Sequence, residues 1–219
     1  MTKPATKAKA PQKAQQKAPR PARLEPFRLG TIPGAMPGKW VSRWKQQRPQ
    51  QRIELIPLDV PEQERALRDG TVDAAICRMP LGGDDLHVID LYEEIPVVVM
   101  SADSHLCAAE TLTADDLSGE VLIVPRDDVL GPLGLSTIEP SFAPLDTTAD
   151  AIATVATGVG IAVVPQSLAR LHRRKDVEQR PLAGGPELPV VLAWLRDRDA
   201  EDTQVFVGIT RGRTSRSSR

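Results

Sequence analysis

The stretch TADAIATVATGVGIAVVPQSLARL, Thr148 to Leu171, carries three secondary-structure signals in succession. Its first half has the apolar spacing of an amphipathic helix, with Thr147 or Thr148 placed to cap the start and Gly158 to end it. The apolar run IAVVP then predicts a buried strand, and QSLARLH predicts another helix. A helix, a strand and a helix in this order favour an α/β fold.

The same alternation fills the chain from Phe27 to Arg78. FRLGTI (27–32), RIELIPLD (52–59) and VDAAICR (72–78) predict strands, while GKWVSRWKQQ (38–47) and PEQERALRDG (61–70) predict helices. In the first helix Trp40, Val41 and Trp44 share one face. This β-α-β-α-β order predicts mostly parallel sheets with helices on both faces.

Further strands and helices follow on either side of the opening stretch. IPVVVMS (95–101), VLIVP (121–125) and PVVLAWL (189–195) predict strands, and TADDLSG (113–119) and AEDTQVFVGIT (200–210) predict helices. The alternation alone leaves open whether the chain forms one lobe or two.

Length and composition fit a folded protein without a membrane span. The 219 residues allow one large domain or two small lobes, and 41% are hydrophobic. No apolar run reaches the ~18 residues of a transmembrane helix, and the basic first 26 residues lack the apolar middle of a secretory signal. We therefore expect a cytoplasmic protein with no membrane partner.

The formal net charge of −1 hides a division between acidic and basic segments. Residues 1–23 carry seven Lys and Arg and no acid, and the last nine residues carry four Arg, which leaves −12 for residues 24–210. Residues 1–26 have almost nothing to bury, so we expect a disordered basic tail. The tails are interpreted as solvated tethers, which we favour, or as segments that bind nucleic acid non-specifically.

The segment LGTIPGAMPGKW (29–40) has some features of a phosphate-binding loop. The first glycine of that motif would fall at Pro33, and the residue after Lys39 is Trp40 in place of Ser or Thr. Pro33 and Pro37 also lack the N–H groups that such a loop donates. Two interpretations remain, a site for a small anion at a helix start and a simple strand-to-helix turn.

No enzyme signature or metal-binding pattern stands out. His87, His105 and His172 lie far apart, and the paired acids are typical of solvated turns or helix starts. We therefore predict no catalytic residue, no metal site and no cofactor. Cys77 and Cys107 are interpreted as small core residues, with a redox pair as the alternative.

Four segments in order resemble the effector-binding domain of LysR-type transcriptional regulators. These are FRLGTIP (27–33), LDVPEQERALRDGTVDAAICR (58–78), the crossing segment EEIPVVVMSADSHLCAAETLTADDLSGEVLIVP (93–125) and the opening stretch, which is similar to V-A-x-G-x-G-I-A-x-x-P. The resemblance covers about residues 27–210.

The resemblance implies a two-lobed type 2 periplasmic-binding-protein-like fold. Lobe I would hold residues 27–94 and 188–210, lobe II would hold residues 95–187, and residues 211–219 would be a basic C-terminal tail. It further implies a small, anionic or polar effector bound in the cleft between the lobes, a role in transcriptional regulation, and a homodimer.

Position by position, the resemblance assigns cleft residues to the ends of strands and the starts of helices. The candidates are Thr31, Ile32, Pro33, Arg78, Pro125, Arg126, Thr147, Thr148, Gly158, Val159 and Gly160. Regulators of this family begin with a winged helix-turn-helix, whereas the residues before Phe27 are too few and too polar for one. We therefore expect a stand-alone sensor domain, with non-specific DNA contact through the tails as the alternative.

Overall fold

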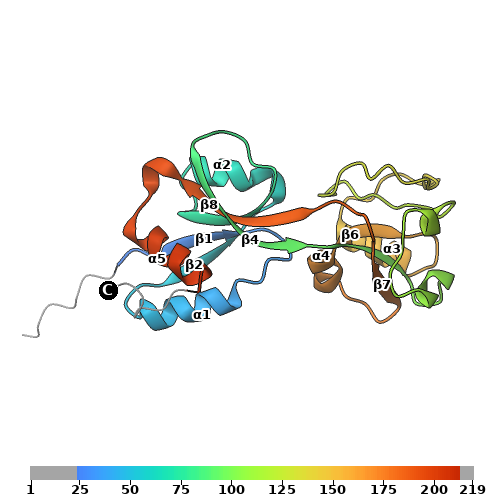
Figure 1. Ribbon diagram of the computed structural model, residues 1–219, viewed down its shortest axis with the longest axis horizontal. Helices are drawn as coiled ribbons and strands as arrows, with labels where there is room; N and C mark the ends of the chain where they lie inside the picture. Colours follow the sequence, from blue (N-terminus) through green and yellow to red (C-terminus); the bar gives the residue numbers. More distant parts are fainter. Residues whose placement is uncertain (1–23, 213–219) are drawn as a thin grey trace, which may run out of the picture.

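Two lobes lie side by side along the long axis of the molecule (Figure 1). The computed structural model describes residues 24–212, so the predictions for residues 1–23 and 213–219 lie outside the described residues. Lobe I consists of β1 (Phe27–Thr31), α1 (Gly38–Gln47), β2 (Ile53–Pro57), η1 (Val60–Glu62), α2 (Gln63–Arg68), β3 (Ala74–Arg78), β4 (Leu86–Glu94), β8 (Leu188–Leu195), η4 (Arg196–Arg198) and α5 (Glu201–Thr210).

Lobe II is formed by the chain between β4 and β8. It consists of β5 (Pro96–Ser101), η2 (His105–Ala108), η3 (Asp115–Leu117), α3 (Thr148–Val155), β6 (Ala162–Pro165), α4 (Gln166–Leu171) and β7 (Val177–Pro181). The chain crosses between the lobes twice, once from β4 to β5 and once from β7 to β8 (Figure 1).

The sheet of lobe I has the strand order β2-β1-β3-β8-β4. The strands β1, β2 and β3 pair in parallel, as the alternation predicts, while β8 runs antiparallel to both of its neighbours, β3 and β4. Helices α1 and α5 cover one face through Trp44 and Phe206, and α2 covers the other through Leu67. Helices on both faces are thus confirmed for this lobe.

The sheet of lobe II has the order β6-β5-β7 and is antiparallel throughout. The expected strand at 121–125 forms only isolated parallel bridges, among them Leu122 with Ile161. Parallel pairing is therefore less common than predicted, because the chain enters lobe II on β5 and returns beside it on β7. Helices α3 and α4 pack on one face of this sheet, around Ile152 and Leu168.

An aromatic cluster anchors α1 to the sheet of lobe I. Trp44 is fully buried and stacks on Phe27 of β1 with a centroid separation of 4.7 Å, and Phe206 of α5 lies 5.3 Å from Phe27. The indole N–H of Trp44 also donates to the carbonyl of Gln51 at 3.2 Å.

Within residues 24–212 no helix combines the length and the apolar content that a membrane crossing requires.

Candidate functional site

The carboxyl ends of the three parallel strands of lobe I form one edge of the candidate site. Thr31, Pro57 and Arg78 end β1, β2 and β3, and the register pairs Thr31 with Pro57 and with Ile76. Chain segments that follow parallel strands meet at one sheet edge, where α/β proteins bind ligands. Thr31 and Arg78 therefore lie at the same edge, as the resemblance implies.

Arg78 is the central polar residue of this edge, and it is buried, with 6% of the residue exposed. Its backbone is fixed by Gln63 of α2, whose side chain accepts from the N–H of Arg78 at 3.0 Å and donates to its carbonyl at 2.8 Å. Its Nη1 donates to Oε2 of Glu94 at 2.7 Å, and that carboxylate is buried too. The positive charge of Arg78 is thus compensated inside the protein.

The second terminal nitrogen of Arg78 connects the two lobes. Nη2 donates to the carbonyl of Pro33 at 3.4 Å and to the hydroxyl of Ser167, in the first turn of α4, at 3.3 Å. Gly34 is also close to lobe II, since a Cβ atom there would lie 2.4 Å from the Ser167 hydroxyl. The interlobe contact therefore rests on the turn after β1, on Arg78 and on the start of α4.

Two polar atoms of this ion pair lack a partner within the described residues. Arg78 Nε and Glu94 Oε1 are both buried and make no hydrogen bond. Buried polar atoms without partners are rare and often mark a site where a ligand or water binds. The pair offers one donor and one acceptor in a region without net charge.

Pro125, Arg126, Thr147 and Thr148 lie at the end of lobe II that faces lobe I. Residues 121–125 run parallel to β6, and β6 ends at Pro165, which pairs with Pro96 at the crossing. Arg126 and Asp146 form an exposed ion pair at 3.0 Å, and the Thr148 hydroxyl donates to Asp127 at 2.9 Å.

Thr147 caps α3 at this same end of lobe II. Its hydroxyl accepts from the N–H of Asp150 at 3.1 Å, as the sequence predicts for an N-cap. The Thr148–Asp127 bond and the bond from the Arg126 N–H to the Leu145 carbonyl hold the start of α3 beside the 121–126 segment.

The structure does not bring Gly158, Val159 and Gly160 to this edge. They precede β6 and therefore lie at its far end, where a Cβ atom on Gly160 would lie 2.3 Å from the carbonyl of Val121. A glycine at position 160 is thus explained by close backbone packing. Ile32 is also removed from the edge, because its side chain is part of the lobe I core.

A groove of about 1000 Å³ runs between the lobes beside the Arg78–Glu94 pair. The turn after β1 and the start of α1 form one wall, α4 forms the other, and the end of β4 with Ile95 forms the floor. Met36, Trp40, Tyr92, Ile95 and Leu171 make it largely apolar, Glu93 and Glu94 lie at its floor, and Lys39 and Arg170 add two positive charges. Burial, followed by the nearby Glu94 carboxylate, raises the pKa of Tyr92.

Glu94, Ser167 and Gly34 are contact residues that the sequence did not reveal. Ser167 follows strand β6 at a helix start, so the rule that selected Arg126 after its predicted strand would have selected Ser167 as well. Glu94 and Gly34 carried no comparable signal, because the role of Glu94 depends on the strand order of lobe I and that of Gly34 on a contact with Ser167 of lobe II.

The cysteines lie in different lobes. Cys77 is buried in β3 and burial raises the pKa of its thiol to about 12, while Cys107 lies half-buried in η2. Neither forms a disulfide, and their separation argues against a redox pair within one chain. Among residues 24–212 no group of three His, Cys, Asp or Glu side chains is placed to hold a metal ion.

Comparison with known proteins gives consistent matches. Residues 25–215 match the family model described as the LysR substrate binding domain. The Hca operon transcriptional activator HcaR of Escherichia coli (strain K12) is 27% identical over 173 residues, which are 74% of this chain and 57% of HcaR. The HTH-type transcriptional regulator CatR of Pseudomonas putida is 32% identical over 144 residues, which are 60% of this chain and 48% of CatR. The chain thus spans about half the length of these relatives.

Solved structures confirm the fold. The effector binding domain of BenM with its effector benzoate has a TM-score of 0.70 and 20% identity, over 86% of this chain and 91% of that one. The likeness extends over both lobes, so the predicted two-lobed, periplasmic-binding-like α/β fold is correct.

Proposed function

We propose that this chain, which belongs to the LysR substrate-binding domain family, binds a small effector between its lobes. Through this binding it would take part in transcriptional regulation. The observation that carries this proposal is the groove beside the buried Arg78–Glu94 pair, lined by residues of both lobes. A ligand that contacts two lobes joined by two crossing segments favours one relative orientation of the lobes over others.

The lining of the groove supports a specific ligand class. Its apolar residues suit an aromatic or aliphatic body, and Lys39 and Arg170 suit a carboxylate at the rim. The Arg78 charge is already neutralised by Glu94 and Arg78 does not itself line the groove, so it adds little net attraction for an anion. The effector we propose is therefore a small organic carboxylate with an apolar body.

A thermal-shift titration tests this proposal. The panel comprises benzoate, which is the effector of BenM, together with other aromatic, aliphatic and dicarboxylic acids. A ligand at 100 times its Kd should stabilise the protein by about 2.7 kcal/mol. Lys39→Gln should reduce the shift, whereas Lys45→Gln, on the same helix but outside the groove, should leave it unchanged.

Two further variants locate the ligand between the lobes. Thr31→Val and Arg126→Ala remove polar groups from the two facing edges. If the thermal shift is lost in Arg126→Ala but kept in Lys39→Gln, the ligand binds at the lobe II edge and not in the groove. A panel without any binder, or a shift that no variant reduces, would contradict interlobe binding.

A second candidate function follows from the charge of the tails. Seven cations in residues 1–23 and four in residues 211–219 flank a body of charge −12, so the tails are suited to non-specific binding of DNA. We expect steeply salt-dependent DNA binding that is lost when residues 1–23 are deleted. Unchanged binding after that deletion would exclude the N-terminal tail as the contact.

Homodimer formation, implied by the family resemblance, also stays a proposal. Sedimentation of the full chain with and without a bound carboxylate would measure both the assembly state and its response to ligand.

A further inference from the structure

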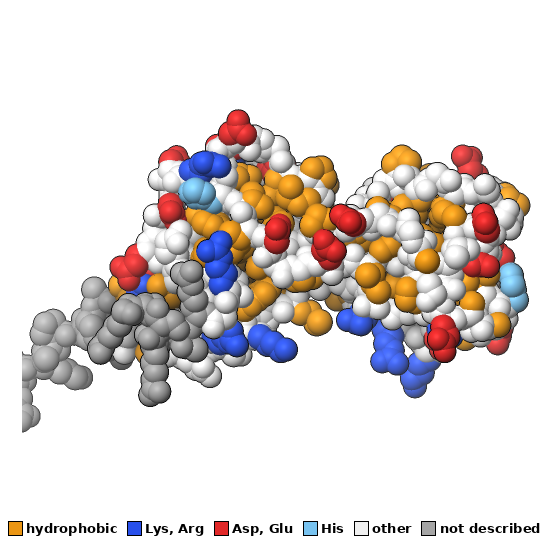
Figure 2. Space-filling model, in the orientation of Figure 1, with side chains coloured by type: hydrophobic (Ala, Val, Ile, Leu, Met, Phe, Trp, Pro, Cys, Tyr) orange, Lys and Arg blue, Asp and Glu red, His pale blue; other side chains and the backbone are white. Residues whose placement is uncertain are grey.

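A basic hollow on lobe II lies outside the interlobe groove. It has a volume of about 920 Å³ and is lined by α4, the turn after it, β7 and Val99 of β5. Lys and Arg side chains gather on the underside of this lobe (Figure 2). They come from the sequence RLHRRKD, residues 170–176, which stands out in a body that is acidic overall.

Three of the four cations at the hollow have no carboxylate partner within residues 24–212. Arg174 is neutralised by Asp176, to which its Nε and Nη2 donate at 2.8 and 2.7 Å. Arg170, Arg173 and Lys175 form no ion pair. These three side chains therefore give the lining of the hollow an excess of positive charge.

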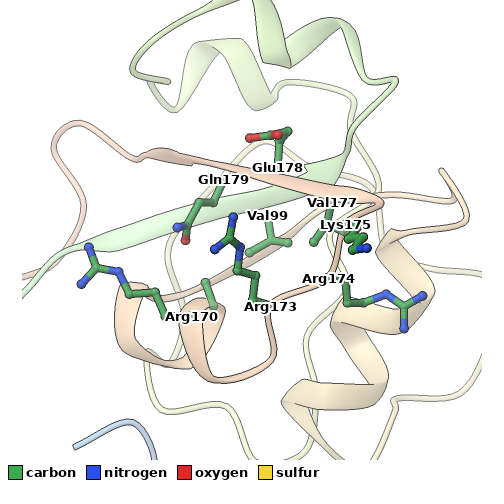
Figure 3. A pocket seen from close by; sticks show the side chains of 9 residues that line it. Val99, Arg170, Arg173, Arg174, Lys175, Val177, Glu178 and Gln179 are labelled. Carbon is green, nitrogen blue, oxygen red and sulfur yellow. The ribbon is translucent and has the colours of Figure 1, made fainter. Parts of the chain in front are cut away.

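The one carboxylate among the lining residues points away from the hollow. Successive side chains of a strand alternate between its faces, so Val177 and Gln179 face one side of β7 and Glu178 faces the other. Figure 3 shows Glu178 above the strand, while Arg173 extends from below toward Gln179. Glu178 also pairs with Arg180, at 3.3 Å.

The floor and wall of the hollow add two kinds of contact to this charge. Val99, Ala169 and Val177 make the floor apolar. Gln179 lines the wall, and its Oε1 is buried without a hydrogen-bond partner among the described residues. A helix C-terminus alone would explain basic residues here, since cations are stabilised near it, but not the concave apolar floor beside them.

We propose that this hollow binds a small organic anion with at least two negative charges and an apolar part. The guanidinium of Arg173 at the centre and Lys175 at one end would bind the anionic group, and the Val99–Val177 floor would contact the apolar part. The site is separate from the interlobe groove, and only Arg170 lines both.

Calorimetric titration of the full chain with phenyl phosphate at pH 8 tests the proposal, because the phosphate is then a dianion. The double variant Arg173→Gln/Lys175→Gln should weaken binding by about tenfold or more. The charge-matched double variant Arg65→Gln/Lys45→Gln, on exposed helices of lobe I, should bind as the parent does. Added salt should weaken the binding, since the site is open to solvent.

Any of the following results would overturn the proposal. Phenyl phosphate that does not bind, or that binds equally well to the Arg173→Gln/Lys175→Gln variant, excludes this site. Equal affinity for inorganic phosphate excludes a role for the apolar floor. Binding of duplex DNA through Arg173 and Lys175, without binding of phenyl phosphate, identifies a nucleic-acid contact instead. Lys39→Gln is the control for the interlobe groove: binding that this variant weakens and Arg173→Gln/Lys175→Gln does not would place phenyl phosphate in the groove and overturn the proposal.

Discussion

At the scale of single residues, the Arg78–Glu94 pair decides what the edge of lobe I can do. Arg78 follows a predicted strand, so its place at the edge could be inferred from the sequence. Its partner could not, because Glu94 reaches it through the strand order β3-β8-β4, which no local pattern encodes. Taken alone, Arg78 predicts a free cation for an anionic effector, whereas the pair makes it a neutral, buried connection between the lobes.

The buried pair predicts a strong stability effect. Arg78→Met leaves the Glu94 carboxylate buried without its partner, which should cost about 3–5 kcal/mol of unfolding free energy. The double variant Arg78→Met/Glu94→Leu should recover most of that loss. Arg68→Met, which removes a solvent-exposed ion pair, should have a much smaller effect. Urea unfolding measures all three, and equal losses for Arg78→Met and Arg68→Met would contradict the burial argument.

The two cysteines should differ in their reaction with thiol reagents. With a pKa of about 12, only about one Cys77 thiol in ten thousand is ionised at pH 8, and the residue is buried. Cys107 is partly exposed and should react first. Iodoacetamide labelling followed by peptide mass analysis should therefore find Cys107 modified in the native protein and Cys77 modified only after denaturation. Rapid labelling of Cys77 in the native state would contradict its packing in β3.

At the scale of elements, a helix or strand could be predicted from the sequence best where its local sequence signal and its tertiary contacts favour the same structure. Helix α3 has an N-cap, an apolar stripe and a glycine after its end, and it forms as expected. The segment 121–125 has the composition of a strand but pairs only through isolated bridges. The glycines at 158 and 160 marked a turn correctly, but the direction of β6 places that turn away from lobe I.

The N-cap of α3 gives an element-scale prediction. Thr147→Ala removes the hydroxyl that accepts from the Asp150 N–H, which should cost about 1 kcal/mol of stability. Thr157→Ala is the matched control, because Thr157 lies just beyond the helix end, and its hydroxyl donates to the Thr154 carbonyl and caps no free N–H group. Thermal unfolding compares them. If Thr147→Ala lowers the unfolding free energy no more than Thr157→Ala does, the start of α3 is stabilised by its packing on lobe II alone.

At the scale of the whole molecule, the spacing of the lobes depends on a small number of atoms. Arg78, Ser167 and the turn at Gly34 meet where the turn between β1 and α1 reaches the start of α4. Each lobe has its own core, so a change at this contact should alter the relation between the lobes more than the stability of either.

Gly34→Ala should therefore change the shape of the molecule. Gly34 has φ +84°, and an added Cβ would collide with the Ser167 side chain of the other lobe. Gly119→Ala is the matched control, because Gly119 has φ +82° and open space around it. Both should lose about 1–2 kcal/mol from backbone strain, but only Gly34→Ala should increase the radius of gyration in small-angle scattering and weaken carboxylate binding. Identical scattering for the two variants would show that the lobes adjust without moving apart.

The double crossing has a further consequence for synthesis on the ribosome. Lobe II is encoded as one continuous segment, whereas lobe I needs β8, which lies between β3 and β4 and comes almost at the end of the chain. Lobe II can therefore fold during translation before β8, the partner strand of β4, has been synthesised. Lobe II is then complete before lobe I, which reverses the usual N-terminal-first order. Lobe I is completed only when β8 and then α5, whose Phe206 packs in its core, have left the exit tunnel, so the groove between the lobes is among the last features to form.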